Sequence, residues 1–339
     1  MTSERGSNGF SKTSKSRRVL VTGASGFVGS HVCDRMVAEG WTVRCLVRST
    51  SSRGWLEHLP VEYAVSDVSQ DNKLEEDMVG CDAVVHGAGI TNAVRTEDFF
   101  EVNTRGTQRL WRAAANAGAK RFVFISSLAA AGPSLTDEPQ DESADPHPVN
   151  EYGKSKRAAE EFIMQASDAM QGVIVRPPAV YGPRDADGLT LIRAAKTRIF
   201  PLPLQGKREL VLVYATDLAQ GIHLALERGR PDGIYYFTDG GVHTLPEVGE
   251  AIAQALGVQI KMIPIPRWLL RTAALGGEFA GRVLGRVLPI NMQRVKNFEL
   301  DGWTASDARA RRELGYDSKY GLRSGMEETV RWYQSVGWI

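Results

Sequence analysis

The feature that most constrains the fold is a glycine-rich turn between an apolar run and a helical pattern. Gly23, Gly26 and Gly29 recur at every third position, directly after the run Val19-Leu20-Val21-Thr22. In a strand–turn–helix unit of this kind, backbone N–H groups and the helix N-terminus hold a pyrophosphate. The spacing differs from Gly-x-Gly-x-x-Gly, the commonest dehydrogenase fingerprint. The turn therefore predicts a dinucleotide-binding unit near the start of the chain.

From residue 17 to about residue 180, short β-branched runs alternate with longer helical patterns. The predicted strands cover residues 18–22, 42–47, 62–66, 83–86, 121–126 and 172–176, and the predicted helices cover 29–39, 73–79, 99–117 and 151–165. Strands joined by helical crossovers form a parallel sheet that is covered on both faces. The pattern predicts an α/β fold with a doubly wound parallel sheet.

After Tyr181 the pattern loosens into turns and prolines, which indicates a second region. Residues 210–213 with 217–227, and residues 234–237, look like sheet and helix that return to the first domain. We therefore predict a disordered tail at 1–16, a nucleotide-binding domain at 17–180 plus about 210–240, and a smaller, mainly helical C-terminal substrate lobe at about 181–209 and 241–339. A ligand should lie between the two, outside the carboxyl ends of the strands.

Composition excludes several classes of function. The 41 basic and 40 acidic residues give a formal net charge of +1, which provides no field for nucleic acid. Cys33, Cys45 and Cys81 are predicted to be buried thiols in a reducing compartment, and their spacing fits no metal site. The tail lacks the apolar core of a signal peptide, and no apolar run reaches about 18 residues. We expect a cytoplasmic protein without a membrane span.

Residues 267–288 form an unusual segment of the second region. On a helix, Arg267, Arg271, Arg282 and Arg286 would fall within roughly 100° of one another. The apolar side chains on the other side are Trp268, Leu269, Leu270, Phe279, Val283, Leu284, Val287 and Leu288. One interpretation is one or two amphipathic helices that pack on the lobe, with a break expected at Gly276-Gly277. The other is a lid over an apolar substrate or a weak contact with a membrane surface.

The end of the second predicted strand bears on the choice of dinucleotide. Enzymes that select NAD usually place an acid about 20 residues beyond the glycine turn, where it binds the ribose diol. Here Val47 holds that position and Arg48 follows it. Arg48, Ser49 and Arg53 could bind a 2′-phosphate, although they could also be solvated loop residues. We therefore predict NADP(H) in preference to NAD(H).

Tyr152-x-x-x-Lys156 places a phenol and an ammonium one helical turn apart. The pKa of a free phenol is near 10, and a neighbouring ammonium and a cationic nicotinamide both favour the phenolate. We therefore predict that the pKa of Tyr152 is lowered toward neutral pH. Ser126-Ser127, at the end of the preceding strand, could supply a hydroxyl that holds the reacting oxygen.

These motifs together resemble the extended short-chain dehydrogenase/reductase superfamily, and the resemblance covers roughly residues 17–332. The matching motifs are Thr22-Gly-Ala-Ser-Gly-Phe-Val-Gly29, Asp67-Val68, His86-Gly-Ala-Gly89, Asn103-x-x-Gly106-Thr107, Ser126-Ser127, Tyr152–Lys156 and Arg176-Pro-Pro-Ala-Val-Tyr-Gly-Pro183. The resemblance implies a Rossmann sheet and identifies Ser127, Tyr152 and Lys156 as the catalytic triad, with Asn103 in a supporting role. It also implies adenine contacts from Asp67 and Val68 and a nicotinamide contact from Pro177.

The predicted cofactor-binding residues combine the turn, the strand ends and the triad. They are Gly23, Ser25, Gly26, Phe27, Val28, Gly29, Arg48, Ser49, Arg53, Asp67, Val68, Ala88, Gly89, Tyr152, Lys156 and Pro177.

Departures from the sugar-nucleotide pattern bear on the reaction. Sugar-nucleotide members carry an Arg-Asp clamp that begins seven residues before the position of Asp217, but Leu210 stands there, although Arg208 is close enough to substitute. The stretch Val43-Arg-Cys-Leu-Val-Arg48 is similar to that of dihydroflavonol reductases and 3-beta-hydroxysteroid dehydrogenases. We expect an NADP-dependent ketone/alcohol oxidoreductase with a largely apolar substrate. The alternatives are a nucleotide-sugar epimerase or dehydratase with tightly held cofactor, and a non-catalytic dinucleotide sensor. In a homodimer, helices 99–117 and 151–165 would pair across a two-fold axis.

Overall fold

A seven-stranded parallel sheet forms the centre of the molecule. The computed structural model describes residues 17–70, 73–166, 169–206, 208–284, 292, 295 and 299–339. The strands are β1 (Arg18–Thr22), β2 (Thr42–Val47), β3 (Glu62–Val65), β4 (Ala83–His86), β5 (Arg121–Ile125), β6 (Gln171–Val175) and β11 (Gly233–Tyr235). Their order across the sheet is β3-β2-β1-β4-β5-β6-β11, and all neighbouring pairs are parallel. This arrangement confirms the predicted Rossmann-type α/β fold.

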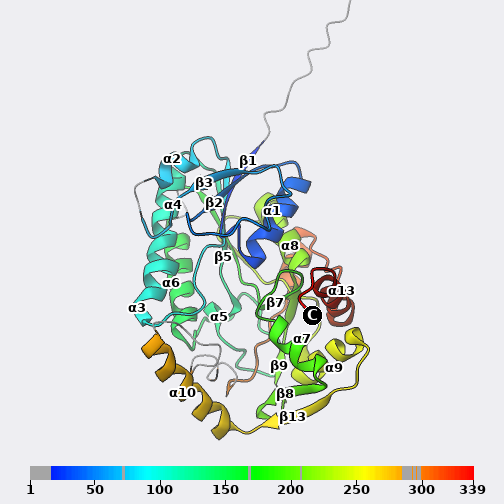
Figure 1. Cartoon of the computed structure of the whole chain (residues 1–339). Coiled ribbons are helices and arrows are strands. Elements are labelled where there is room, and N and C mark those ends of the chain that lie inside the picture. The colour runs from blue at the N-terminus through cyan, green and yellow to red at the C-terminus, as the bar shows by residue number, and fades with distance from the viewer. Residues whose placement is uncertain are drawn as a thin grey trace, which may run out of the picture.

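Helices cover both faces of this sheet, which explains why its strands are apolar at nearly every position (Figure 1). On one face α1 (Phe27–Ala38) packs against α8 (Ala215–Arg228). On the other lie α2 (Leu74–Met78), α4 (Gly106–Asn116) and α6 (Glu151–Gln165). Val19 and Val21 of β1 join the first core and Leu20 joins the second, so that successive residues of one strand fill opposite layers.

The helix predicted over residues 99–117 is interrupted near its start. The structure has α3 (Thr96–Phe99), then a π-helical segment η1 (Phe100–Arg105), and then α4. Such π segments occur often at functional sites, because the extra residue re-aims side chains. Here Asn103 of η1 points inward, where it is buried.

The second region combines helices with small sheets. It contains β7 (Ala179–Tyr181), α7 (Leu189–Lys196), β8 (Ile199–Pro203), η2 (Leu204–Gly206), β9 (Glu209–Leu210), β10 (Leu212–Tyr214), β12 (His243–Thr244), α9 (Leu245–Leu256), β13 (Lys261–Ile265), α12 (Ala308–Leu314) and α13 (Leu322–Ser335). Strand β10 pairs with β7, β12 with β9, and β13 with β8. The segment predicted at 210–213 therefore joins small two-stranded sheets and not the central sheet. A capping box between Thr244 and Glu247 starts α9.

A single helix, α10 (Arg267–Leu284), lies along the lower edge of the view in Figure 1. The prediction of a break at Gly276-Gly277 is wrong: glycine keeps its backbone N–H, so it weakens a helix by about 1 kcal/mol without interrupting the hydrogen-bond ladder. Trp268 and Leu275 are 66% and 58% exposed, so these two side chains do not pack on the lobe.

Arg267 and Arg271 of α10 both pair with Glu299. The side chains of Phe279, Arg282, Val283 and Leu284 and the whole of residues 285–291 lie outside the described part of the chain, as does the tail at 1–16. The lid or membrane-surface role of this segment therefore stays a prediction. No helix among the described residues has the length and apolar character needed to cross a bilayer.

Candidate active site

The turn between β1 and α1 is built by close approach of backbones. Gly23 has φ +69°, and a Cβ added there would lie 2.7 Å from the backbone carbon of Gly87. A Cβ on Gly29 would lie 2.0 Å from the Gly23 carbonyl oxygen. No side chain caps the N-terminus of α1 at Gly26. The turn is therefore a cradle of backbone groups at a helix N-terminus, which fits the pyrophosphate of a dinucleotide.

A buried chain of hydrogen bonds holds the facing loop in place. Thr107 Oγ1 donates to the Asn103 carbonyl oxygen (2.6 Å), so it accepts from His86 Nε2 (2.9 Å). Thr22 Oγ1 accepts from the Ala88 N–H (3.0 Å) and therefore donates to His86 Nδ1 (2.7 Å). Burial and the charge of Lys156 lower the pKa of His86 to about 3, which keeps the ring neutral in this arrangement.

These polar residues were not predicted as functional, although Thr22, His86 and Thr107 all belong to the motifs quoted above. Their spacing shows a motif, but only the fold shows that the three side chains form one line beneath the Gly87–Gly89 loop.

A cavity of about 260 Å³ lies beside the glycine turn, at the carboxyl ends of β1, β2 and β3. Among its lining residues are Gly23, Ser25, Gly26, Arg48, Asp67, Val68, Ala88 and Gly89, all of them predicted to bind the cofactor. Among the described residues that line this cavity, Asp67 is the sole acid, and its carboxylate accepts from the N–H and Oγ of Ser69. Val47 at the end of β2 also lines it, so no acid occupies that strand end.

Ser49 and Arg53, which were predicted to bind the 2′-phosphate with Arg48, do not line this cavity. Ser49 is absent from its wall, and the Arg53 guanidinium lies 4.5 Å from the centre of the Tyr63 ring. Ser51 takes the expected place of Ser49: it lines the cavity and its hydroxyl accepts from the Arg48 N–H at 3.1 Å. The loop turns back after Arg48, since the Ser51 N–H donates to the Arg48 carbonyl, and sequence spacing alone does not show this turn.

The three predicted catalytic residues meet at the carboxyl end of β5. Ser127 caps the short helix α5 (Leu128–Ala131) through a hydrogen bond to its hydroxyl from the Ala129 N–H. Tyr152 lies on the first turn of α6, near enough to the Ser127 hydroxyl for that group to lower the pKa of the phenol. Lys156 Nζ, one turn later, donates to the Ile125 carbonyl oxygen at 2.7 Å. All three line one cavity of about 560 Å³, together with Phe27, Val28, Gly29, Gly89 and Pro177.

The electrostatics of this pair differ from the sequence-based expectation. Burial lowers the pKa of Lys156 to about 7. Burial raises the pKa of Tyr152, and the nearby Ser127 hydroxyl opposes this rise only in part. The predicted lowering by the ammonium is therefore wrong for the protein alone, because Lys156 points toward the Ile125 carbonyl and lies 4.2 Å above the Phe124 ring. The phenol is therefore protonated at neutral pH.

Asn103 supports this site from behind. Its Oδ1 accepts from the Ile90 N–H at 2.8 Å, and its Nδ2 donates to the Ile90 carbonyl and to Ser155 Oγ, both at 3.0 Å. A Cβ on Gly89 would lie 2.8 Å from Asn103 Oδ1. Asn103 therefore connects the Gly89–Ile90 loop to α6, and it does not line the catalytic cavity.

A buried ion pair, which the sequence did not predict, stands directly behind the predicted catalytic residues. Arg176 donates to both carboxylate oxygens of Glu160, at 2.9 and 2.7 Å, and to the Tyr236 hydroxyl at 3.1 Å. Ser126 Oγ also donates to Glu160, at 2.5 Å. Because Ser126 precedes Ser127 and Arg176 precedes Pro177, this pair fixes two walls of the cavity. Glu160 stands one turn after Lys156, which was the available signal.

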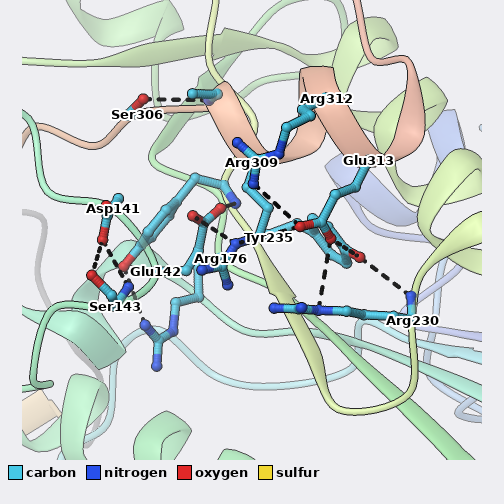
Figure 2. A network of polar contacts seen from close by, with 12 residues as sticks. Asp141, Glu142, Ser143, Arg176, Arg230, Tyr235, Ser306, Arg309, Arg312 and Glu313 are labelled. Carbon is cyan, nitrogen blue, oxygen red and sulfur yellow. Dashed lines mark hydrogen bonds and ion pairs between the residues drawn. The ribbon is translucent and has the colours of Figure 1, made fainter.

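The polar contacts continue from there to α12, as Figure 2 shows. The Tyr236 N–H donates to Glu142, whose other oxygen lies 3.4 Å from Arg309 of α12. Glu313 of the same helix accepts from the Tyr235 hydroxyl at 3.0 Å and pairs with Arg230 at 3.7 Å. The C-terminal part of the chain is thereby attached to the edge of the central sheet.

A second cavity, of about 460 Å³, also lies against two of the predicted catalytic residues. Ser127 and Tyr152 line it together with Leu210, and its further wall includes Arg208 and Trp303. Leu210 therefore lines this space where a sugar-nucleotide enzyme would carry the clamp arginine, whereas Arg208 is buried and pairs with Asp301 at 3.4 Å.

Comparison with known proteins agrees with the fold. The model of the NAD dependent epimerase/dehydratase family matches residues 19–236. A ceramide reductase of Caulobacter vibrioides is 30% identical over 324 residues, which cover 95% of this chain and 96% of that protein. A 4-hydroxy-2-methyl-3-oxo-4-farnesyl-3,4-dihydroquinoline-1-oxide ketoreductase of Stigmatella aurantiaca is also 30% identical, over 91% of this chain and 95% of that protein. The solved UDP-glucose 4-epimerase of Thermus thermophilus, in complex with NAD, is 26% identical with a TM-score of 0.76, and the match covers 94% of this chain and 99% of that chain.

Proposed function

Because the chain belongs to the NAD dependent epimerase/dehydratase family, and is an extended short-chain dehydrogenase/reductase, we propose that it interconverts a ketone and a secondary alcohol. We further propose that it prefers NADP(H) and that its substrate is largely apolar. The observation that carries the proposal is that Ser127 and Tyr152 both line two cavities with mainly apolar walls.

The glycine turn, the Gly87–Gly89 loop and Lys156 would hold the dinucleotide, whose nicotinamide supplies the hydride for reduction. In the direction of reduction, the Ser127 hydroxyl holds the carbonyl oxygen of the substrate. Tyr152 donates its proton to that oxygen as the alcohol forms. The raised pKa of Tyr152 suits this direction, because the residue starts in its protonated form. Arg48 would favour a 2′-phosphate, since Val47 places no acid beside it.

The test is NADPH-dependent reduction of apolar ketones by Tyr152→Phe. We expect turnover to fall by about 10²- to 10⁴-fold, the range of one general acid, while NADPH affinity stays within twofold. Tyr63→Phe, on the half-exposed strand β3, is the matched control and should leave turnover unchanged. Retained turnover in Tyr152→Phe would refute the role of the phenol. Tighter binding of NAD than of NADP by tenfold would refute the cofactor preference.

One observation favours a second candidate, epimerisation or dehydration of a nucleotide sugar. The Arg208 guanidinium lines the second cavity and could contact a diphosphate. Such a reaction returns its hydride to the substrate within each cycle. Net consumption of NADPH with ketones, and none with nucleotide sugars, would decide for the first candidate.

A further inference from the structure

Two cavities meet at the catalytic hydroxyls, and their meeting point determines which carbonyl compounds fit. Ser127 and Tyr152 line both of them, as do Pro178, Ala179, Leu210 and Leu245. We propose that the substrate is a ketone with an extended apolar group on each side of its carbonyl, one group in each cavity. This inference rests on the proposed function and specifies the substrate class of the same site.

The first of these spaces, here called the lobe cavity, extends from Tyr152 between α7, α9 and α13. Its wall there is formed by Leu191, Ile192, Val248, Ile252 and Met326. Two polar groups of this wall are engaged within the protein: Thr329 Oγ1 donates to the Gly325 carbonyl at 2.7 Å, and Asp185 Oδ1 accepts from the Asp187 N–H at 2.9 Å. The surface offered to a ligand is thus mainly hydrocarbon.

The second space, the side cavity, lies over α5 and beside β9. Leu128, Ala129, Val211 and Trp303 form its apolar wall. The Val211 N–H donates to the Trp303 carbonyl at 3.1 Å, which fixes these two residues next to each other. Arg208 and Glu209 also line this cavity. At about 460 Å³ it has room for a chain of several carbons. The lobe cavity, of about 560 Å³, also contains the space beside Gly29, Lys156 and Pro177 that the nicotinamide end of the cofactor would take, so its part between α7, α9 and α13 is left for the substrate.

The position of the carbonyl along a chain therefore matters more than the length of the chain. With the carbonyl oxygen on Ser127 and Tyr152, an aldehyde or a methyl ketone would leave the side cavity without hydrocarbon. A mid-chain ketone fills both cavities, and each methylene buried contributes about fourfold to transition-state binding. The reduction itself is balanced: the carbonyl carbon gains the hydride of NADPH, the oxygen gains the Tyr152 proton, and NADP⁺ and the secondary alcohol are released. Solvent then returns a proton to the phenol.

The test compares two ketones of equal carbon number, 2-dodecanone and 6-dodecanone, with the wild-type protein and NADPH. Because the two have the same composition and differ in the position of the carbonyl, their kcat/KM ratio reports how the carbonyl divides the chain. We expect 6-dodecanone to be favoured by at least about tenfold. Equal turnover, or preference for 2-dodecanone, would overturn the inference and leave the proposed function standing. Failure of both ketones under saturating NADPH would instead refute the proposed function, and the inference with it.

A variant then identifies the cavity responsible. Ala129→Leu should fill part of the side cavity and lower the 6-dodecanone to 2-dodecanone ratio by about tenfold, while the same change at Ala115, outside both cavities, should leave the ratio unchanged. If Ala129→Leu does not fold, Glu209→Trp enters the side cavity from its exposed edge and should have the same effect. A ratio that neither variant changes would show that the side cavity takes no part of the substrate.

Discussion

The nucleotide-binding half and the lobe achieve their shapes by different means. In the glycine turn, a Cβ added to Gly23 would lie 2.7 Å from backbone atoms, so the main chain itself forms the wall of the site. In the lobe, Gly257 at the end of α9 has nearly the same φ, +66° against +69°, yet nothing lies within 4 Å of its added Cβ. Gly23 allows two backbone segments of the chain to approach each other closely, whereas Gly257 allows only the left-handed backbone at the end of a helix.

The two halves also differ in how polar groups are used. Behind the catalytic residues, Glu160 and Arg176 are buried and bonded to each other. The lobe is held by an apolar cluster that includes Ile192, Phe200 and Ile252. A polar network specifies a single geometry, because any displacement leaves a buried group unsatisfied, whereas an apolar cluster tolerates exchange of similar volumes. Chemistry that is common to a family thus needs the first kind of region, and variation of substrate is accommodated by the second.

The largest effect should come from Gly23→Ala, and Gly257→Ala is its matched comparison. Gly257→Ala keeps open space around the new methyl group, so only the left-handed backbone is disfavoured, by about 1–2 kcal/mol. Gly23→Ala has the same backbone cost and in addition overlaps Gly87, so we expect loss of more than ~100-fold in NADPH affinity or failure to fold. Calorimetric binding and thermal unfolding check both. Similar behaviour of the two variants would show that the close approach at Gly23 has no special role.

The next comparison removes one carboxylate charge from each half. Glu160→Gln leaves the Arg176 charge buried without its partner and should cost about 3–5 kcal/mol in the free energy of unfolding. Glu247→Gln in the lobe alters an exposed capping box and should cost less than ~1 kcal/mol. Urea titration of both proteins measures the difference. A Glu160→Gln protein as stable as Glu247→Gln would mean that the buried pair adds no rigidity to the catalytic wall.

A pH dependence distinguishes the buried lysine from an exposed one. The pKa of Lys156 is about 7 in the folded protein, against 10.5 for a lysine in water, so between these limits the unfolded chain binds the extra proton. The wild type therefore gains stability as pH rises from 7 toward 10, by up to ~1.4 kcal/mol per pH unit. Lys156→Met lacks this gain. The excess of its free energy of unfolding over that of the wild type should therefore be largest near pH 7 and should shrink as pH rises.

Lys261→Met, on the exposed strand β13 of the lobe, is the matched control for the loss of one lysine side chain at the surface. Parallel curves for Lys156→Met and the wild type would contradict the lowered pKa.

The sequence predicted the central sheet well for a physical reason. Strands β1, β2 and β4 have the bounds that their apolar runs predicted, because parallel strands between two layers of helices must be apolar throughout. The meeting of Ser127, Tyr152 and Lys156 was also predictable, since a strand end and a helix of this fold bring them together. These elements were predictable because local sequence patterns determine them within this fold.

The remainder depends on contacts between distant segments, which a local pattern does not record. The break predicted at Gly276-Gly277 was wrong, because helix propensity is only a small term. The pairing of Arg176 with Glu160 joins a strand end to a helix. In the sequence, neither residue differs from a charged residue at the surface, so the pair was not predicted. The lowered pKa expected for Tyr152 failed because the direction of the Lys156 side chain is decided by the Ile125 carbonyl.

The smallest effect should come from substituting Arg48 or Arg208. These two changes should also separate the roles of the two halves most clearly, because only the first should affect NADPH affinity. Arg48 lines the nucleotide cavity and Arg208 lines the side cavity. Arg48→Gln removes a charge that would bind the 2′-phosphate, so NADPH affinity should fall about tenfold while NADH affinity stays within twofold. Arg208→Gln should leave both affinities unchanged, because the cavity that it lines is the one we propose for the substrate. Equal loss of NADPH and NADH binding in Arg48→Gln would show that this arginine shapes the loop and does not read the phosphate. Loss of dinucleotide binding in Arg208→Gln would show that the two halves are coupled through the catalytic residues that line both cavities.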